Sequence, residues 1–103
     1  MSLDFNGRVS IVTGAGGGLG REHALALAAR GAKVVVNDFE RRMPGAEGVS
    51  AAESVVREIR AAGGVAMPSH ASVTDEPAMR EMVSEVMAQW GRIDILVNNA
   101  GIL

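Results

Sequence analysis

The chain has 103 residues, of which 48% are hydrophobic and 21% are charged, and its formal net charge is −2. This length and composition fit one soluble globular unit, and the weak negative charge gives no reason to expect a nucleic-acid partner. The absence of cysteine excludes disulfides and thiolate zinc sites. The sequence shows neither a secretory signal nor an apolar run near the roughly 20 residues of a membrane-spanning helix. We therefore expect a cytoplasmic protein with no membrane partner.

The first part of the sequence predicts two buried strands with a helix between them. Residues 8–13 and 33–38 are short apolar runs, and the second contains consecutive valines, as in the strands of a parallel sheet. Residues 19–30 are predicted to form a helix that ends at Gly31. The loop predicted over residues 39–49 is longer than most connections between a strand and a helix.

The alternation of strand and helix continues after this loop. Ser50 and Glu53 form an S-x-x-E capping box that predicts the start of a second helix, which ends at Gly63 and Gly64. Residues 65–68 are a weaker strand prediction. The apolar residues of the second helix recur at helical spacing and are Ala52, Val55, Val56 and Ile59.

A third helix is predicted to be capped by Thr74 or Asp75, to tolerate Pro77 in its first turn and to end at Gly91. Its apolar stripe is expected to belong to the core and comprises Met79, Met82, Val83, Val86, Met87 and Trp90. A strand over residues 93–97 completes the order β-α-β-α-β-α-β, which predicts an α/β protein with a Rossmann-type doubly wound parallel sheet. Such a sheet usually continues, so the architecture looks truncated after the fourth strand.

The run from Thr13 to Gly20 joins the first strand directly to the first helix. Glycines allow a sharp turn and a close approach of backbone N–H groups to an anion, and the helix start adds free donors. This arrangement predicts a cradle for a pyrophosphate. The glycines fit three templates, the last of which is typical of methyltransferases: Gly14, Gly18 and Gly20; Gly14, Gly17 and Gly20; and Gly16, Gly18 and Gly20.

Polar residues follow two of the predicted strands at the edge where open α/β sheets bind ligands. Asp38 can accept hydrogen bonds from ribose hydroxyls and would repel a 2′-phosphate, which favours NAD over NADP; the alternative is a solvated carboxylate. Asn98 and Asn99 leave a buried strand, where unpaired amides are costly, so they either tie neighbouring strands together or contact a cofactor. Ala100 and Gly101 leave room for a ribose.

Together these segments resemble the short-chain dehydrogenase/reductase family. Its T-G-x-x-x-G-x-G and N-N-A-G motifs are matched within residues 13–20 and by residues 98–101. The resemblance implies that Asp38 holds the adenosine ribose and that Gly18 and Leu19 line the pyrophosphate and nicotinamide side. Ser72 and Val73 stand where relatives often have an Asp-Val pair that faces adenine, so the adenine contact comes from the backbone or the serine hydroxyl. The predicted NAD-binding residues are Gly14, Gly18, Leu19, Gly20, Asp38, Ser72, Val73, Asn99, Ala100 and Gly101.

Within the family, several segments are similar to the (3R)-hydroxyacyl-CoA dehydrogenase units of multifunctional β-oxidation enzymes. These segments are residues 18–21, 35–38, the loop after Asp38, and residues 91–103. The resemblance implies hydride transfer between a secondary alcohol or ketone and a nicotinamide cofactor, with a 3-hydroxyacyl-CoA as one candidate substrate. It also implies that residues 1–103 are the dinucleotide-binding half of a single domain, and that the complete protein is a homo-oligomer.

No catalytic residue can be assigned in this chain. Family members use a Tyr-x-x-x-Lys pair and a serine, whereas this sequence has no tyrosine and its single lysine is Lys33. We therefore expect the chain alone to be inactive. Two alternatives stay open, a catalytically silent nucleotide-binding module and an S-adenosylmethionine-binding domain like those of methyltransferases. His23 and His70 lie far apart in sequence, so no metal site is predicted, and Asp94 is expected to be structural.

Overall fold

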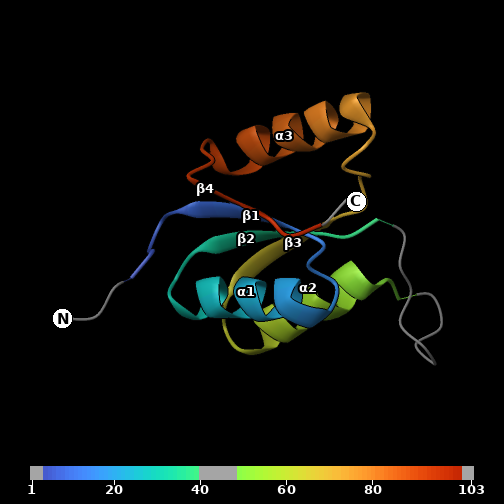
Figure 1. Ribbon diagram of the computed structural model, residues 1–103. Coiled ribbons are helices and arrows are strands. Elements are labelled where there is room, and N and C mark those ends of the chain that lie inside the picture. Colours follow the sequence, from blue (N-terminus) through green and yellow to red (C-terminus); the bar gives the residue numbers. More distant parts are fainter. Residues whose placement is uncertain (1–3, 40–48, 101–103) are drawn as a thin grey trace.

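A computed structural model describes residues 4–39 and 49–100 and shows three layers (Figure 1). A four-stranded parallel sheet with the order β3-β2-β1-β4 lies between α1 and α2 on one face and α3 on the other. This architecture confirms the predicted class and chain order. The elements are β1 (Val9–Thr13), α1 (Gly18–Ala29), β2 (Lys33–Asn37), α2 (Ala51–Ala61), β3 (Val65–Ser69), α3 (Glu76–Trp90) and β4 (Ile95–Asn98).

The register of the sheet brings the carboxyl ends of all four strands into one row. Thr13 at the end of β1 pairs with Asn37 of β2 and with Asn98 of β4, and Asn37 pairs with Ser69 of β3. The segments that follow these strands therefore start side by side at one edge. This is the edge at which sequence analysis placed the ligand.

The central strands are buried on both faces, which explains their continuous apolar sequences. Val34 and Val36 of β2 pack into the cluster beneath α1 and α2, whereas Val35 packs on the α3 side. All four apolar residues predicted for α2 are buried against the first cluster. Ser50 caps α2 as predicted, because its Oγ accepts a hydrogen bond from the backbone N–H of Glu53 at 3.0 Å.

The helix and strand ends differ from the predictions by a few residues at most. Asp75, rather than Thr74, caps α3 by accepting a hydrogen bond from the backbone N–H of Ala78 at 3.1 Å. Gly31 and Gly91 follow α1 and α3 with φ of 95° and 73°, a conformation that favours glycine. Strand β3 continues through Pro68 to Ser69. A proline is possible here because β3 lies at the edge of the sheet.

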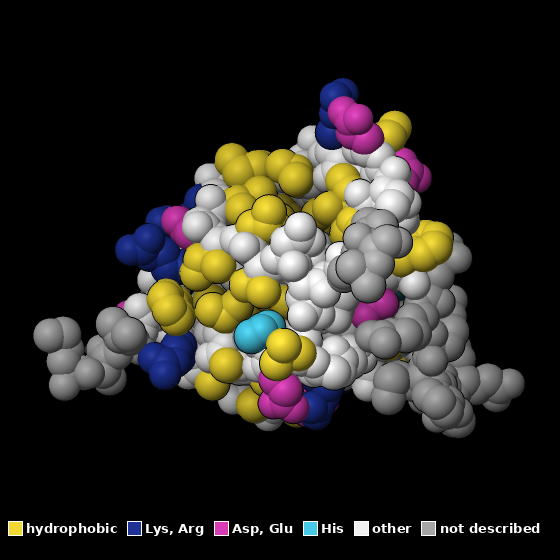
Figure 2. Space-filling model, in the orientation of Figure 1, with side chains coloured by type: hydrophobic (Ala, Val, Ile, Leu, Met, Phe, Trp, Pro, Cys, Tyr) yellow, Lys and Arg dark blue, Asp and Glu magenta, His cyan; other side chains and the backbone are white. Residues whose placement is uncertain are grey.

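The prediction that the whole apolar stripe of α3 belongs to the core is wrong. Met82 and Val86 are buried against the sheet, but Val83 and Met87 are 40% and 46% exposed. Among the described residues, α3 is the only helix on its face of the sheet, so its outer flank meets no second helix (Figure 1). Leu96 of the edge strand β4 is also 65% exposed, and Figure 2 shows hydrophobic side chains gathered on the surface between the two helical layers.

Residues 40–48, most of the predicted long loop, lie outside the described residues. Within the part of the chain that is described, no helix is both long enough and apolar enough to cross a membrane.

Candidate functional site

Among the described residues, no side chain caps the first N–H groups of α1 after the turn from β1. Gly17, at the N-cap position, is extended and has no side chain to accept a hydrogen bond. Gly14 and Gly18 have φ of 63° and 54°, so the chain reverses direction in a way that L side chains rarely permit. The first turn of α1 contains no acidic residue. Free donors and the positive end of the helix dipole therefore meet at an opening suited to an anion.

The glycines of this turn serve two different physical purposes. A Cβ at Gly20 would lie 2.2 Å from the carbonyl oxygen of Gly14 and 2.6 Å from Asn99 Nδ2, so this glycine is required for packing between α1 and the loops. A Cβ at Gly18, in contrast, would meet no atom of the described residues within 4 Å. Next to it, Leu19 is 65% exposed, which leaves a large apolar side chain at the mouth of the turn.

Polar side chains hold the segment after β4 against this turn. The hydroxyl of Thr13 donates to Asn98 Oδ1 at 3.2 Å and accepts from the backbone N–H of Ala100 at 3.1 Å. Asn99 Nδ2 donates to the carbonyl oxygen of Gly14 at 3.3 Å. Both amides therefore tie neighbouring segments together, which was one of the two roles left open by the sequence. Gly101 lies outside the described residues.

Asp38 is held in place at the end of β2. Its side chain accepts a hydrogen bond from the backbone N–H of Gly16 at 2.7 Å, and its own backbone N–H donates to Ser69 at 2.9 Å. The residue is only 8% exposed, so the alternative of a freely solvated carboxylate is wrong. A carboxylate can accept several hydrogen bonds, of which the one from Gly16 fixes its orientation.

The first turn of α2 forms one wall beside this carboxylate, a feature that sequence reasoning missed. A Cβ at Gly16 would lie 2.6 Å from the Ala51 Cβ and 2.7 Å from Asp38 Oδ2. The glycine turn, the Asp38 carboxylate and α2 therefore meet at Gly16. The capping box predicted the start of α2, but no local pattern shows which loop a helix start will touch.

Ser72 and Val73 lie half-buried in the connection between β3 and α3. The hydroxyl of Ser72 is 2.8 Å from the hydroxyl of Thr74, and it accepts a hydrogen bond from the backbone N–H of Thr74 at 3.3 Å. The hydroxyl thus stabilises the local turn, as an aspartate would do in the same place. This leaves the backbone as the better candidate for an adenine contact.

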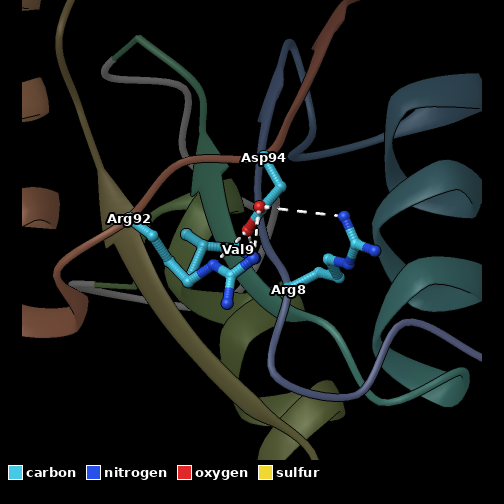
Figure 3. Close-up of polar contacts among 4 residues, drawn as sticks. All are labelled: Arg8, Val9, Arg92 and Asp94. Atoms are coloured by element: carbon cyan, nitrogen blue, oxygen red, sulfur yellow. Dashed lines mark hydrogen bonds and ion pairs between the residues drawn. The ribbon is translucent and has the colours of Figure 1, made fainter.

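The opposite edge of the sheet carries a separate polar cluster (Figure 3). Asp94 Oδ2 accepts hydrogen bonds from the backbone N–H of Val9 and from Arg92 Nε, both at 2.8 Å, while Oδ1 accepts from Arg92 Nη2 at 2.7 Å. These contacts lower the pKa of Asp94, with the Arg92 hydrogen bonds as the largest cause and the Val9 hydrogen bond as the second. The cluster joins the starts of β1 and β4, in agreement with the structural role predicted for Asp94.

The parallel sheet and the glycine turn at its carboxyl edge define a Rossmann-type α/β protein. The model of the family described as short chain dehydrogenase matches residues 8–103, and the chain belongs to this family. This match confirms the resemblance expected from the sequence and leaves the methyltransferase alternative without support.

Relatives with known names match most of this chain. It is 53% identical over 102 residues to the mouse "Peroxisomal multifunctional enzyme type 2" and 47% identical over 103 residues to the Saccharomyces cerevisiae "Peroxisomal hydratase-dehydrogenase-epimerase". These alignments cover 98% and 99% of the chain but only 14% and 11% of the two relatives. The match confirms the predicted similarity to multifunctional enzymes. The expected cytoplasmic location is wrong, because these relatives are peroxisomal, and cysteine content does not distinguish the two compartments.

Solved structures share the same fold. A short chain dehydrogenase from Mycobacterium avium is 53% identical with a TM-score of 0.85, and it matches 95% of this chain and 35% of its own. A 7α-hydroxysteroid dehydrogenase complexed with NADH and 7-oxo glycochenodeoxycholic acid is 37% identical with a TM-score of 0.84, matching 96% of this chain and 36% of its own. The chain thus spans about a third of these structures.

Proposed function

We propose that residues 1–103 form the dinucleotide-binding half of a single Rossmann-type domain in an NAD-dependent oxidoreductase. The observation that carries this proposal is the position of Asp38, which is held by Gly16 beside the uncapped start of α1. A pyrophosphate at the helix start and a ribose at the carboxylate would be bound by neighbouring parts of one edge. Family membership and a structural neighbour solved with NADH support the nicotinamide cofactor.

The residues of this chain would bind and orient the cofactor. The N–H groups at the start of α1 would hold the pyrophosphate, and Gly18 and Leu19 would border its nicotinamide side. Asp38 would accept hydrogen bonds from the adenosine ribose. Ser72 and Val73 would face the adenine, and Asn99 and Ala100 would lie where a small residue leaves room for a ribose. When bound, the nicotinamide ring supplies the hydride acceptor or donor for interconversion of a secondary alcohol and a ketone.

The proton-transfer groups would lie in a part of the complete protein outside this chain. The sequence has no tyrosine, and its single lysine, Lys33, begins β2 at the edge opposite the glycine turn. Lys33 Nζ lies 6.0 Å from the ring centroid of Trp90, within reach of a cation–π contact. These facts also support the alternative that the chain alone is a catalytically silent nucleotide-binding module, and we expect it to turn over no alcohol by itself.

The names of the relatives suggest a substrate class to test. Several are multifunctional or hydratase-dehydrogenase enzymes, while a Rhodococcus relative is a cyclohexanol dehydrogenase. We propose a 3-hydroxyacyl-CoA as the substrate of the complete protein. NADH binding to the complete protein, followed by fluorescence, tests the cofactor assignment. Turnover of (3R)-hydroxyacyl-CoA compared with that of cyclohexanol tests the substrate assignment. Absence of NADH binding would refute the function, whereas binding with turnover of cyclohexanol alone would refute only the acyl-CoA assignment.

The Asp38→Asn variant is expected to lose its preference for NAD over NADP. Asparagine retains an oxygen that can accept from Gly16, but it removes the charge that strengthens hydrogen bonds from ribose and repels a 2′-phosphate. The ratio of NADH to NADPH affinity, measured by isothermal titration, should fall by about tenfold, the equivalent of about 1.4 kcal/mol. The exposed Asp4→Asn variant serves as the control and should keep the wild-type ratio. An unchanged ratio in Asp38→Asn would contradict the assigned role.

A further inference from the structure

The first turn of α2 is joined to the end of β3 by a histidine. Ser50 Oγ accepts the hydrogen bond from the backbone N–H of Glu53 and also lies 2.8 Å from His70 Nε2. Glu53 Oε1 lies 3.8 Å from the same nitrogen. Ser50 is only 1% exposed, so its hydroxyl requires a partner inside the protein. The imidazole provides one in either tautomer, because a hydroxyl can donate or accept.

The residues next to this contact in the chain lie beside Asp38. Ala51, the residue after Ser50, closes one side of Gly16 while Asp38 closes another. On the strand side, the residue before His70 accepts the hydrogen bond from the backbone N–H of Asp38 at 2.9 Å. The contact between Ser50 and His70 is therefore flanked in the chain by Ala51 and by Ser69, and each of these packs or bonds beside Asp38.

The other side of the His70 ring is open. A cavity of about 270 Å³ lies between the end of β3 and α3, and His70, Glu81, Met82 and Glu85 are among the residues that line it. The His70 side chain is 39% exposed. Within the part of the chain that the structure describes, the polar contacts that orient the ring are those with Ser50 and Glu53.

We propose that His70 is a positioning residue for the adenosine half of the bound dinucleotide. Its bond to Ser50 holds the first turn of α2 against Gly16, and this keeps Asp38 aligned with the ribose. The inference rests on the proposed function, since it concerns how that same site binds its cofactor. Loss of the imidazole frees the start of α2 and leaves the buried Ser50 hydroxyl without its partner from β3.

The test compares His70→Ala and His70→Gln in the complete protein, with His23→Ala as the control. His23 is a half-buried histidine on α1 and is remote in sequence from the contacts described above. In His70→Ala the dissociation constants for NADH and ADP-ribose should rise about fivefold, the effect of losing one hydrogen bond. Reduced nicotinamide mononucleotide, which lacks adenosine, should bind as in wild type, and kcat at saturating NAD should not change. Glutamine can place an amide nitrogen near the position of Nε2 and should restore most of the affinity.

The outcomes separate this inference from the proposed function. If wild type binds NADH and His70→Ala binds ADP-ribose equally well, the positioning role is refuted and the cofactor assignment survives. Equal weakening of ADP-ribose and of reduced nicotinamide mononucleotide, with no rescue by glutamine, would show general loss of structure and would also refute the positioning role. A wild-type protein that binds neither NADH nor ADP-ribose would refute both proposals.

Discussion

The Gly20→Ala variant is expected to lose both stability and dinucleotide binding. The added methyl group would lie 2.2 Å from the carbonyl oxygen of Gly14 and 2.6 Å from Asn99 Nδ2, and a backbone carbonyl cannot rotate away as a flexible side chain can. Overpacking of this kind costs about 1–3 kcal/mol, and we expect the upper end of that range. Because relief of the clash must move α1 away from the turn, NADH affinity should fall by about tenfold or more.

The sign of the stability change is itself informative. In a helix with open space, replacement of glycine by alanine is favourable by up to about 1 kcal/mol, so a destabilised variant reports the clash and not helix propensity. Gly18→Ala is the matched control for stability, because its added methyl group meets no atom of the described residues within 4 Å and carries only the strain of a φ of 54°. Urea unfolding should show the smaller loss for Gly18→Ala. A Gly20→Ala variant as stable as wild type would contradict the packing described here.

Local sequence patterns predicted the elements of this fold well because their causes are local. The consecutive valines of β2 are buried on both faces, and the S-x-x-E pattern does cap α2 through Ser50. Gly31 ends α1 because its φ of 95° favours glycine, whatever the rest of the molecule does. The alternation of these elements was then enough to predict a parallel sheet, since each crossover places a helix between two strands.

The site was predictable in position but not in its internal contacts. The sequence placed the glycine turn, Asp38 and Asn99 at one edge, but it could not show that Gly20 packs against Gly14 while Gly18 faces open space. That distinction depends on distances between segments far apart in the chain. The contact of His70 with α2 was missed for the same reason, since a lone histidine after a short strand has no pattern of its own.

The apolar stripe on α3 was predicted to be more deeply buried than it is. Apolar residues at helical spacing identify the face that avoids water, but not how many neighbours that face has. Met82 is buried by the sheet, whereas Val83 and Met87 on the flank of the same stripe remain exposed among the described residues. The apolar stripe therefore predicted the helix correctly, but counting all of its residues as core overestimated how much of the helix is buried.

The Asp94→Asn variant is expected to lower the Tm by several degrees while leaving NADH affinity nearly unchanged. Three N–H groups, one from Val9 and two from Arg92, donate to the two carboxylate oxygens. An asparagine has one oxygen, so whichever way the amide turns, its NH₂ group faces a donor and at least one of these N–H groups loses its acceptor. The backbone N–H of Asp94 also donates to Val9 at 2.8 Å, so the damage falls on the pairing of β1 with β4.

The pH dependence of this effect has a definite sign. The pKa of Asp94 is lowered in the folded protein from its ordinary value of 3.8, so its ionised form binds its partners more favourably than its protonated form does. Its stabilising contribution is fully present above that ordinary value and is lost as the pH falls through the lower folded value. Urea unfolding should therefore show a greater stability difference between wild type and Asp94→Asn near neutral pH than in acid.

Arg8→Gln separates the hydrogen-bonded core of this cluster from its outer ion pair. Arg8 Nη1 lies 3.9 Å from Asp94 Oδ1 and its side chain is 57% exposed, so solvent and salt screen the attraction. We expect this variant to unfold close to wild type at every pH, because the Val9 and Arg92 contacts remain. If Arg8→Gln lost as much stability as Asp94→Asn, long-range charge and not the local hydrogen bonds would hold the starts of β1 and β4 together.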